Sequence, residues 1–140
     1  MYWRIIGVVL VFGFVLGTGS LAGAPERELK KKPSKLEKEL EAACKEVCNG
    51  YLEEIRIGRR IADEEFFTWS IRWLEAQKAV RQKKADLVAA YEAHWKRTKE
   101  TEKFTKEMYD KGKIGSIYYN KTKYYRIQAE IWLNEAKGKK

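Results

Sequence analysis

The feature that most constrains the fold is a long stretch of the chain, residues 59–111, that contains neither glycine nor proline. These two residues are the strongest local breakers of helices and the commonest markers of turns. Within the stretch, apolar residues recur at steps of three and four, as in Phe66, Trp69, Trp73 and Ala76. This is the period of one helix face, and strand-like alternation is not sustained anywhere in the sequence. The sequence therefore predicts an all-α fold of long antiparallel helices.

The first helix is marked at both ends. Ser34 and Glu37 have the spacing of a capping box, in which each side chain accepts a hydrogen bond from the backbone N–H of the other residue. Gly58 is the expected stop. Between these signals, one apolar face recurs at helical spacing. Its main members are Leu36, Leu40, Cys44, Cys48, Leu52 and Ile55.

The second helical segment is expected to begin at Asp63, which can cap it, and to continue without a breaker to residue 110. A single helix of this length would be about 70 Å long. Its apolar stripe lapses at residues 81–84, so a kink or short break near residues 83–86 and a continuous helix are the two alternatives. Ser116 is expected to cap a last helix, and Gly138 to end it.

The first 22 residues have the composition of a secretory signal peptide. Arg4 supplies a positive charge, and residues 5–17 carry no polar side chain. Ser20 and Ala22 are small residues at the positions that favour cleavage after Ala22. The apolar run is shorter than the ~20 residues that span a bilayer, and no cysteine follows it to carry a lipoprotein anchor. We therefore expect export to the periplasm or cell envelope, with an uncleaved N-terminal membrane tether as the alternative.

The rest of the chain divides into a basic linker, residues 23–35, and one helical domain, residues 36–138. Sliding the sequence against itself by 53 residues aligns apolar positions, which is typical of an internal repeat. The sequence thus predicts a duplicated helical hairpin, with approximate copies at 36–82 and 86–138. The aligned pairs are Ile61 with Ile114, Phe66 with Tyr119, Leu74 with Ile127, Ala76 with Ala129 and Val80 with Leu133.

The charge balance bears on partners. The chain has 29 Lys and Arg against 20 Asp and Glu, a net charge of +9, which becomes +8 when Arg4 leaves with the signal peptide. With 35% charged residues, a polytopic membrane protein is excluded, and 44% apolar residues argue against disorder. Because an exported chain does not meet nucleic acid, we expect either a solvated lysine-rich surface or an anionic envelope surface as the electrostatic partner.

A resemblance appears in the segments 108–117 and 126–133. They are similar to the tip motif of TolC-like outer-membrane efflux proteins, which reads Tyr-x-x-Gly, a short polar turn and a helix with spaced Ala and Leu. That family also contains the motif twice. The residues that match are Tyr109, Gly112, Ala129, Glu130 and Leu133.

The resemblance implies a periplasmic helical module, because in the family such turns join long periplasmic helices where an adaptor protein docks. Two departures limit it. Tyr118 and Tyr119 stand where the family has Asp, and no strands of a membrane barrel are readable here. The candidate interaction and turn residues that follow from the repeat and the resemblance are Gly58, Ile61, Tyr109, Gly112, Ile114, Tyr118 and Tyr119.

Residues that could carry chemistry are few. Cys44 and Cys48 lie four apart on one helix, where a disulfide would distort the backbone. Buried thiols are the preferred interpretation and a cross-link between chains is the alternative. His94 is the only histidine, and no serine or cysteine motif accompanies it as a nucleophile. We therefore expect an interface histidine, no enzyme activity, no catalytic residues, no metal and no cofactor.

The aromatic residues are unusually numerous for a small helical chain. Most of the tryptophans and tyrosines are expected in the core, because each buries a large area. The pairs Tyr118–Tyr119 and Tyr124–Tyr125 cannot all face inward, since neighbouring helix residues differ by about 100°. Some of these rings are expected to meet solvent or a partner.

The function these observations predict is non-catalytic association through helices, in envelope transport or assembly. The partner would be another protein or a second copy, with no small-molecule substrate and no nucleic acid. The alternative is a free-standing basic bundle that binds or scaffolds on an anionic envelope surface.

Overall fold

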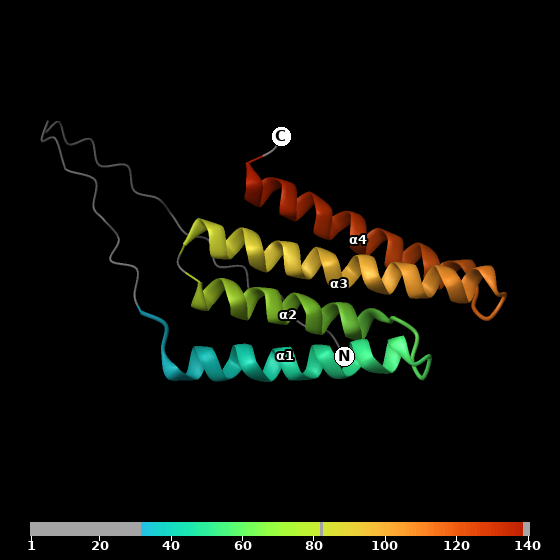
Figure 1. Ribbon diagram of the computed structural model, residues 1–140, viewed down its shortest axis with the longest axis horizontal. Coiled ribbons are helices and arrows are strands. Elements are labelled where there is room, and N and C mark those ends of the chain that lie inside the picture. Colours follow the sequence, from blue (N-terminus) through green and yellow to red (C-terminus); the bar gives the residue numbers. More distant parts are fainter. Residues whose placement is uncertain (1–31, 82, 139–140) are drawn as a thin grey trace, which may run out of the picture.

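The computed structural model describes residues 32–81 and 83–138, and in this part of the chain it contains helices and no strand. The predicted all-α class is confirmed. The predicted signal peptide, and the linker before residue 32, lie outside the described residues. The helices, shown in Figure 1, are α1 (Lys35–Arg56), α2 (Glu64–Val80), α3 (Lys84–Asp110) and α4 (Ser116–Lys137).

Two helix starts follow from side-chain caps that the sequence predicts. At α1, the backbone N–H of Ser34 donates to Glu37 Oε2 at 2.6 Å, and that of Glu37 donates to Ser34 Oγ at 3.2 Å. This is the complete capping box. At α2, Asp63 Oδ1 accepts from the backbone N–H of Phe66 at 3.1 Å. Both predictions are confirmed. The caps could be predicted because these hydrogen bonds join only residues close in sequence.

The start of α4 differs from the prediction by one residue. Ser116 is the first residue of the helix, Gly115 occupies the cap position, and no side chain accepts a capping hydrogen bond there. The end is as predicted, since Gly138 adopts a left-handed conformation with φ of 73°. Glycine reaches this conformation without the steric strain that a Cβ atom would add.

Between α2 and α3 the helix is interrupted and the chain reverses direction. Arg81 leaves α2 in an extended conformation, with φ of −93° and ψ of 127°, and α3 begins at Lys84. The two helices lie side by side in Figure 1. The continuous-helix alternative is therefore wrong, and the break falls slightly before the predicted position.

The turns that join α1 to α2 and α3 to α4 have the same hydrogen bonds. After α1, the N–H of Gly58 donates to Ile55 O at 3.1 Å and that of Arg59 to Glu54 O at 2.9 Å. After α3, Gly112 donates to Tyr109 O at 2.8 Å and Lys113 to Met108 O at 2.9 Å. Both are Schellman motifs, with the glycine at φ of 70° and 67°. The two turns lie at the same end of the bundle (Figure 1).

The helices run alternately up and down and form two hairpins, α1–α2 and α3–α4, that pack together mainly through α2 and α3. α1 also contacts α3. Two hairpins agree with the order of elements that the sequence repeat predicts, while a duplication as their origin stays a prediction.

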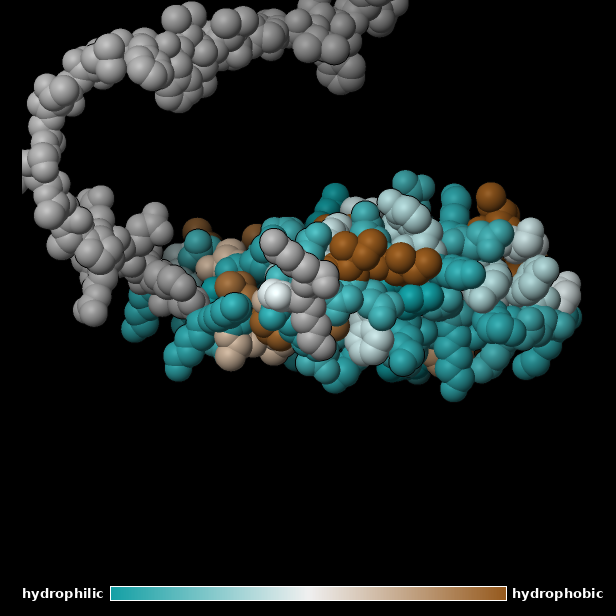
Figure 2. Space-filling view, turned by 90° about the horizontal axis from the view of Figure 1, so that it is seen from above, coloured by the Kyte–Doolittle hydropathy of each residue, from teal (hydrophilic) through white to brown (hydrophobic). Residues whose placement is uncertain are grey.

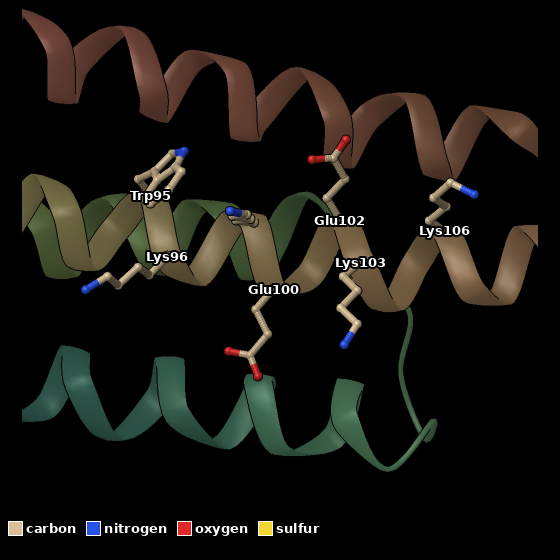
Figure 3. Close-up of a pocket in the computed structure, with 7 residues that line it drawn as sticks. Trp95, Lys96, Glu100, Glu102, Lys103 and Lys106 are labelled. Carbon is tan, nitrogen blue, oxygen red and sulfur yellow. The ribbon is translucent and has the colours of Figure 1, made fainter.

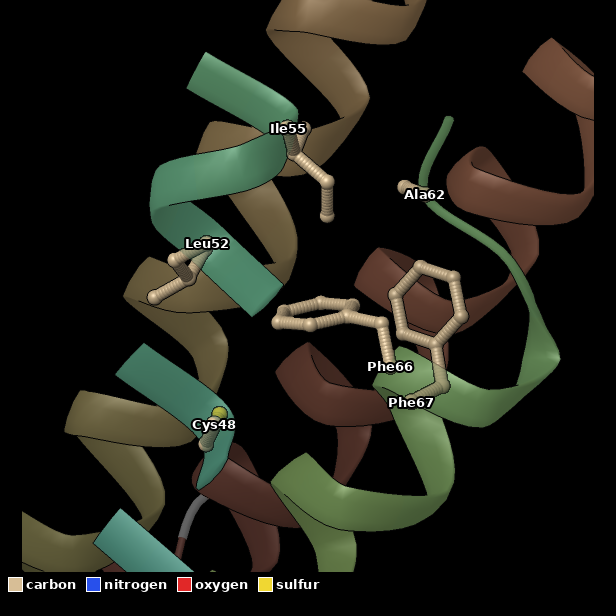
Figure 4. Packing of buried hydrophobic residues seen from close by; sticks show 6 residues of the cluster. All are labelled: Cys48, Leu52, Ile55, Ala62, Phe66 and Phe67. Atoms are coloured by element: carbon tan, nitrogen blue, oxygen red, sulfur yellow. The ribbon is translucent and has the colours of Figure 1, made fainter. Parts of the chain in front are cut away.

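The apolar core is densest near the α1–α2 turn. It is formed by Cys48, Leu52, Ile55, Ala62, Phe66 and Phe67, which Figure 4 shows between α1 and α2. The ring of Phe67 stacks on Tyr125 of α4, with centroids 3.9 Å apart. This contact joins the first hairpin to the second.

The face of α3 that packs against the core carries mostly polar side chains, whereas the buried residues of α1 and α2 are mostly apolar. Thr98, Thr101 and Thr105 are buried, and each hydroxyl donates to a backbone carbonyl of the same helix at 2.8 to 2.9 Å. Because these bonds are internal to α3, the threonines present mainly their methyl groups to neighbouring helices.

The four tryptophans at positions 69, 73, 95 and 132 are half-buried rather than fully buried. The expectation that most of the tryptophans and tyrosines belong to the core is thus wrong for the tryptophans. No helix among the described residues is long and apolar enough to cross a membrane.

Candidate functional site

The first candidate site is a buried polar cluster between α2 and α3. Ser70 Oγ lies 2.8 Å from His94 Nδ1, and Arg97 Nε donates to the same oxygen at 3.1 Å. The exposed fractions of Ser70, His94 and Arg97 are 0%, 2% and 6%. We assign the Ser70 hydroxyl as donor to His94 Nδ1, which leaves the histidine hydrogen on Nε2.

Arg97 is a buried cation without a carboxylate partner among the described residues. Its Nη2 donates to the Ser70 carbonyl at 3.4 Å, and its guanidinium lies 4.0 Å from the centroid of the Trp73 ring. Burial lowers the pKa of Arg97 to about 10, so the side chain stays charged at neutral pH. Polar and aromatic groups therefore stabilise this charge in place of an ion pair.

His94 is held neutral. Burial, and then the charge of Arg97, lower the pKa of His94 to about 3. Its ring stacks on Trp132 of α4 with centroids 5.8 Å apart. The expectation of a partly buried interface histidine gives way to a fully buried one that links α2, α3 and α4.

Cys48 borders the cluster. Burial raises the pKa of its thiol, and the Arg97 charge and a hydrogen bond with Ser70 oppose the rise only in part. Cys44 and Cys48 are both buried and free, which confirms the preferred interpretation of buried thiols. Within residues 32–138, Gln82 aside, no group of histidine, cysteine and acidic side chains could hold a metal ion.

A serine within hydrogen-bond reach of a histidine is the geometry of a nucleophile and its base. The sequence has no serine or cysteine motif beside His94, and the fold brings Ser70, 24 positions away, within hydrogen-bond distance of it. Ser70 lies four residues after Phe66, on the buried face of α2. This helical spacing is the sequence signal from which the burial of Ser70 could have been predicted. However, both groups are closed to solvent, and a histidine with a pKa of about 3 is a weak base at neutral pH.

The second candidate is a groove of about 600 Å³ floored by α3. It is lined by Trp95, Lys96, Lys99, Glu100, Glu102, Lys103 and Lys106 (Figure 3). Figure 3 shows Glu100 pointing toward α1 and Glu102 toward α4. Each binds an arginine of that helix: Glu100 lies 2.8 Å from Arg56 and Glu102 lies 2.8 Å from Arg126.

These ion pairs leave the groove basic, because the two carboxylates are already neutralised by arginines. Four exposed lysines, Lys96, Lys99, Lys103 and Lys106, follow one another at steps of three and four along α3. Two of them have acidic neighbours outside the groove lining, Glu92 for Lys96 and Asp110 for Lys106. The remaining two lysines make the groove attractive to anions.

The third candidate is the solvent-facing side of α4, which we call the α4 outer seam: Ile117, Tyr124, Ile127 and Ile131. Their exposed fractions are 61%, 60%, 40% and 51%. The spacings of seven, three and four are those of positions a and d in a heptad. The buried residues of α4, Thr122, Ala129 and Leu133, lie on the opposite side. Figure 2, which looks down on α4, shows brown apolar side chains among teal hydrophilic ones.

The predicted interaction residues fall into two groups at one end of the bundle. Gly58 and Ile61 belong to the α1–α2 turn. The others surround the α3–α4 turn: Tyr109, Gly112, Ile114, Tyr118 and Tyr119. Tyr109 stacks on Tyr119 at 5.7 Å, so the two tyrosines close this turn, while Tyr118 is 43% exposed. The prediction that the tyrosine pairs cannot all face inward is confirmed.

Comparison with known proteins gives no match: no protein-family model, no curated protein and no solved structure matches this chain. The similarity to TolC-like proteins therefore rests on the motif residues alone.

Proposed function

We propose that this protein is a non-catalytic helical module that acts through helix–helix association, with the α4 outer seam as its contact surface. The observation that carries the proposal is the heptad spacing of four exposed apolar side chains on one helix face. Single exposed apolar residues are common on protein surfaces. A row at positions a and d is instead the pattern by which one helix receives another.

The absence of catalysis is part of the proposal, and the buried cluster supports it. Ser70 and His94 have the spacing of a catalytic pair, but neither is accessible to a substrate. Hydrogen bonds and aromatic stacking already occupy both residues. A structural role explains every contact that the cluster makes.

The setting of the proposal is the cell envelope, as the signal-peptide composition and the TolC-like motif imply. In that setting the module would contribute helix packing to an envelope transport or assembly system. The two turns lie at one end of the bundle (Figure 1), so residues such as Tyr118 would be presented together with the tip of the seam.

Photo-crosslinking in cells that express and export the full chain tests this function. A photoreactive residue replaces Tyr124, and the crosslinked species are compared with and without Ile127→Glu. We expect the crosslinked band to disappear, because a carboxylate cannot be buried in an apolar contact. Leu36→Glu is the matched control, since Leu36 is an apolar residue of α1 with 75% exposure. A band that survives Ile127→Glu, or no band at all, contradicts the proposal.

A second candidate function is supported by the basic groove of α3. Lys99 and Lys103, the two groove lysines without an acidic neighbour in an ion pair among the described residues, favour the alternative of a basic bundle on an anionic envelope surface. Binding of the exported protein to vesicles of anionic phosphatidylglycerol, against neutral phosphatidylcholine, measures it. We expect any such binding to fall steeply from 10 mM to 500 mM salt, since the Debye length shortens from about 30 Å to a few Å. Association through the apolar seam would persist at high salt.

A further inference from the structure

The charges beside the α4 outer seam change sign along the helix. With Ile117 at position a, the flanking positions e and g carry Lys121 and Lys123 in the first half of α4. In the second half they carry Gln128, Glu130, Glu135 and Lys137, so that acidic side chains replace the basic ones over residues 130–135. This distribution is complementary to its own copy when the copy runs in the opposite direction, because Lys123 of each helix then faces Glu130 of the other.

On this basis we propose that the α4 outer seam binds the same seam of a second copy of the chain, with the two α4 helices antiparallel. The inference rests on the proposed function and names its partner. α4 lies at the edge of the bundle, and among the described helices none covers its outer side (Figure 1). Two bundles can therefore approach along this face.

The heptad fixes the register. In an antiparallel pair, position a of one helix meets position d of the other, so Tyr124 faces the partner's Ile127 and Ile127 faces the partner's Tyr124. The two-fold axis then passes between residues 125 and 126. In the same register Lys123 lies opposite the partner's Glu130, and symmetry gives this ion pair twice. Within its own helix each Glu130 also accepts a hydrogen bond from Arg126 at 2.7 Å, so the ion pair across the dimer shares this carboxylate.

The outer layers of the pair are mixed. Ile131 meets the partner's Asn120 and Ile117 meets the partner's Asn134. A polar residue at a core position lowers stability but specifies one register. With a single fully apolar central region, the contact is a small one, so we expect a dimer that forms reversibly with concentration.

The parallel arrangement is disfavoured by the same charges. It would place Glu130 beside the partner's Glu135, twice by symmetry, and would pair Lys123 with the neutral Gln128. Like charges facing each other across an interface destabilise it. Charge therefore selects the antiparallel pair.

Sedimentation equilibrium on the exported protein tests the inference. We expect the mean mass to rise with concentration from one chain toward two. Lys123→Glu should weaken the dimer by about tenfold, because two attractive pairs become repulsive. Glu130→Lys should weaken it at least as much, because it also removes the ion pair with Arg126 of the same helix. The double variant K123E/E130K should associate more tightly than either single variant.

Glu135→Lys is the matched control. It makes the same charge change on the same helix at a position that has no partner charge in the antiparallel register, so the dimer should be unchanged. A tighter dimer with this variant would indicate the parallel arrangement and overturn ours. Circular dichroism confirms that each variant stays helical.

The outcomes separate the inference from the proposed function. If dimers form, are lost in Ile127→Glu, and are not restored in the charge swap, the antiparallel register is wrong while association through the seam stands. If the chain is a monomer at every concentration, the second copy is excluded as the occupant. The photo-crosslink at position 124 then decides association with another protein.

Discussion

Arg97 is a charged side chain that the fold buries without an opposite charge. Its guanidinium depends on Ser70 for two contacts, one to the hydroxyl and one to the carbonyl. The same hydroxyl binds His94. A single small side chain therefore satisfies two buried polar groups, and its loss has a larger effect than its size suggests.

Replacement of Ser70 by alanine is the direct measure of this dependence. We expect Ser70→Ala to lower the free energy of unfolding by about 2–3 kcal/mol, because Arg97 and His94 each lose a buried partner. Urea denaturation measures it. Thr68→Ala is the control, since this hydroxyl of α2 is exposed and bonds only its own helix at Glu64. A change of less than 0.5 kcal/mol is expected there; equal losses in both variants would refute the argument.

The pKa of His94 makes stability depend on pH in a defined window. In the unfolded chain the histidine titrates near pH 6.5, and in the folded protein its pKa is about 3. Between these values the unfolded state binds the extra proton, so stability falls as pH falls from about 6.5 to about 3. The slope contributed by this group is at most about 1.4 kcal/mol per pH unit.

The measurement is the urea midpoint from pH 7 to pH 4 for the wild type and for His94→Gln, whose amide does not titrate. Surface carboxylates contribute equally to both proteins, so the difference between the two curves isolates His94. Parallel curves would show that His94 is not held neutral by the fold.

At the scale of the element, the helix starts of α1 and α2 could be predicted from the sequence because capping is local. Ser34, Glu37 and Asp63 bond backbone groups within three residues. The break after Val80 could be predicted only as one of two alternatives, since the sequence at 81–83 contains no glycine or proline and the packing of α2 on α3 favours the break. The polar face of α3 was missed because a hydropathy pattern counts threonine as polar.

The glycines show how the same residue has opposite effects in a turn and in a helix. Gly58 has φ of 70° and Gly50 lies within α1, and a Cβ atom at either position would meet no atom within 4 Å. Gly58→Ala should therefore destabilise the protein by about 1 kcal/mol through backbone strain alone. Gly50→Ala should stabilise it by about 0.5–1 kcal/mol. Thermal denaturation of both variants checks the sign, and equal signs would contradict the assignment.

At the scale of the whole molecule, the sequence predicted paired hairpins but placed the interaction residues at their turns. The α4 outer seam could not be predicted as a contact surface because α4 carries apolar residues on two faces. Only the packed bundle shows that Ala129 and Leu133 face inward while Ile127 and Ile131 face solvent. Which of two apolar faces is buried is decided by the partner helices, and this information is not local to α4.

Dimer formation through the seam predicts that the melting temperature depends on protein concentration. Because association stabilises only the folded state, Tm of the wild type should rise by several degrees over a hundredfold increase in concentration. The Ile127→Glu variant should melt at a temperature independent of concentration. A wild-type Tm that does not move would argue against the dimer.

The alternation of the helices also has a mechanical consequence. α1 begins and α4 ends at the end of the bundle opposite both turns (Figure 1). A force applied between these two ends would peel α1 and α4 away one helical turn at a time, and such loading meets little resistance. A force between one end and the Gly112 turn would instead act along α3, about 40 Å long, and load its contacts in shear. The bundle is thus expected to resist force between a chain end and the Gly112 turn better than force between the start of α1 and the end of α4.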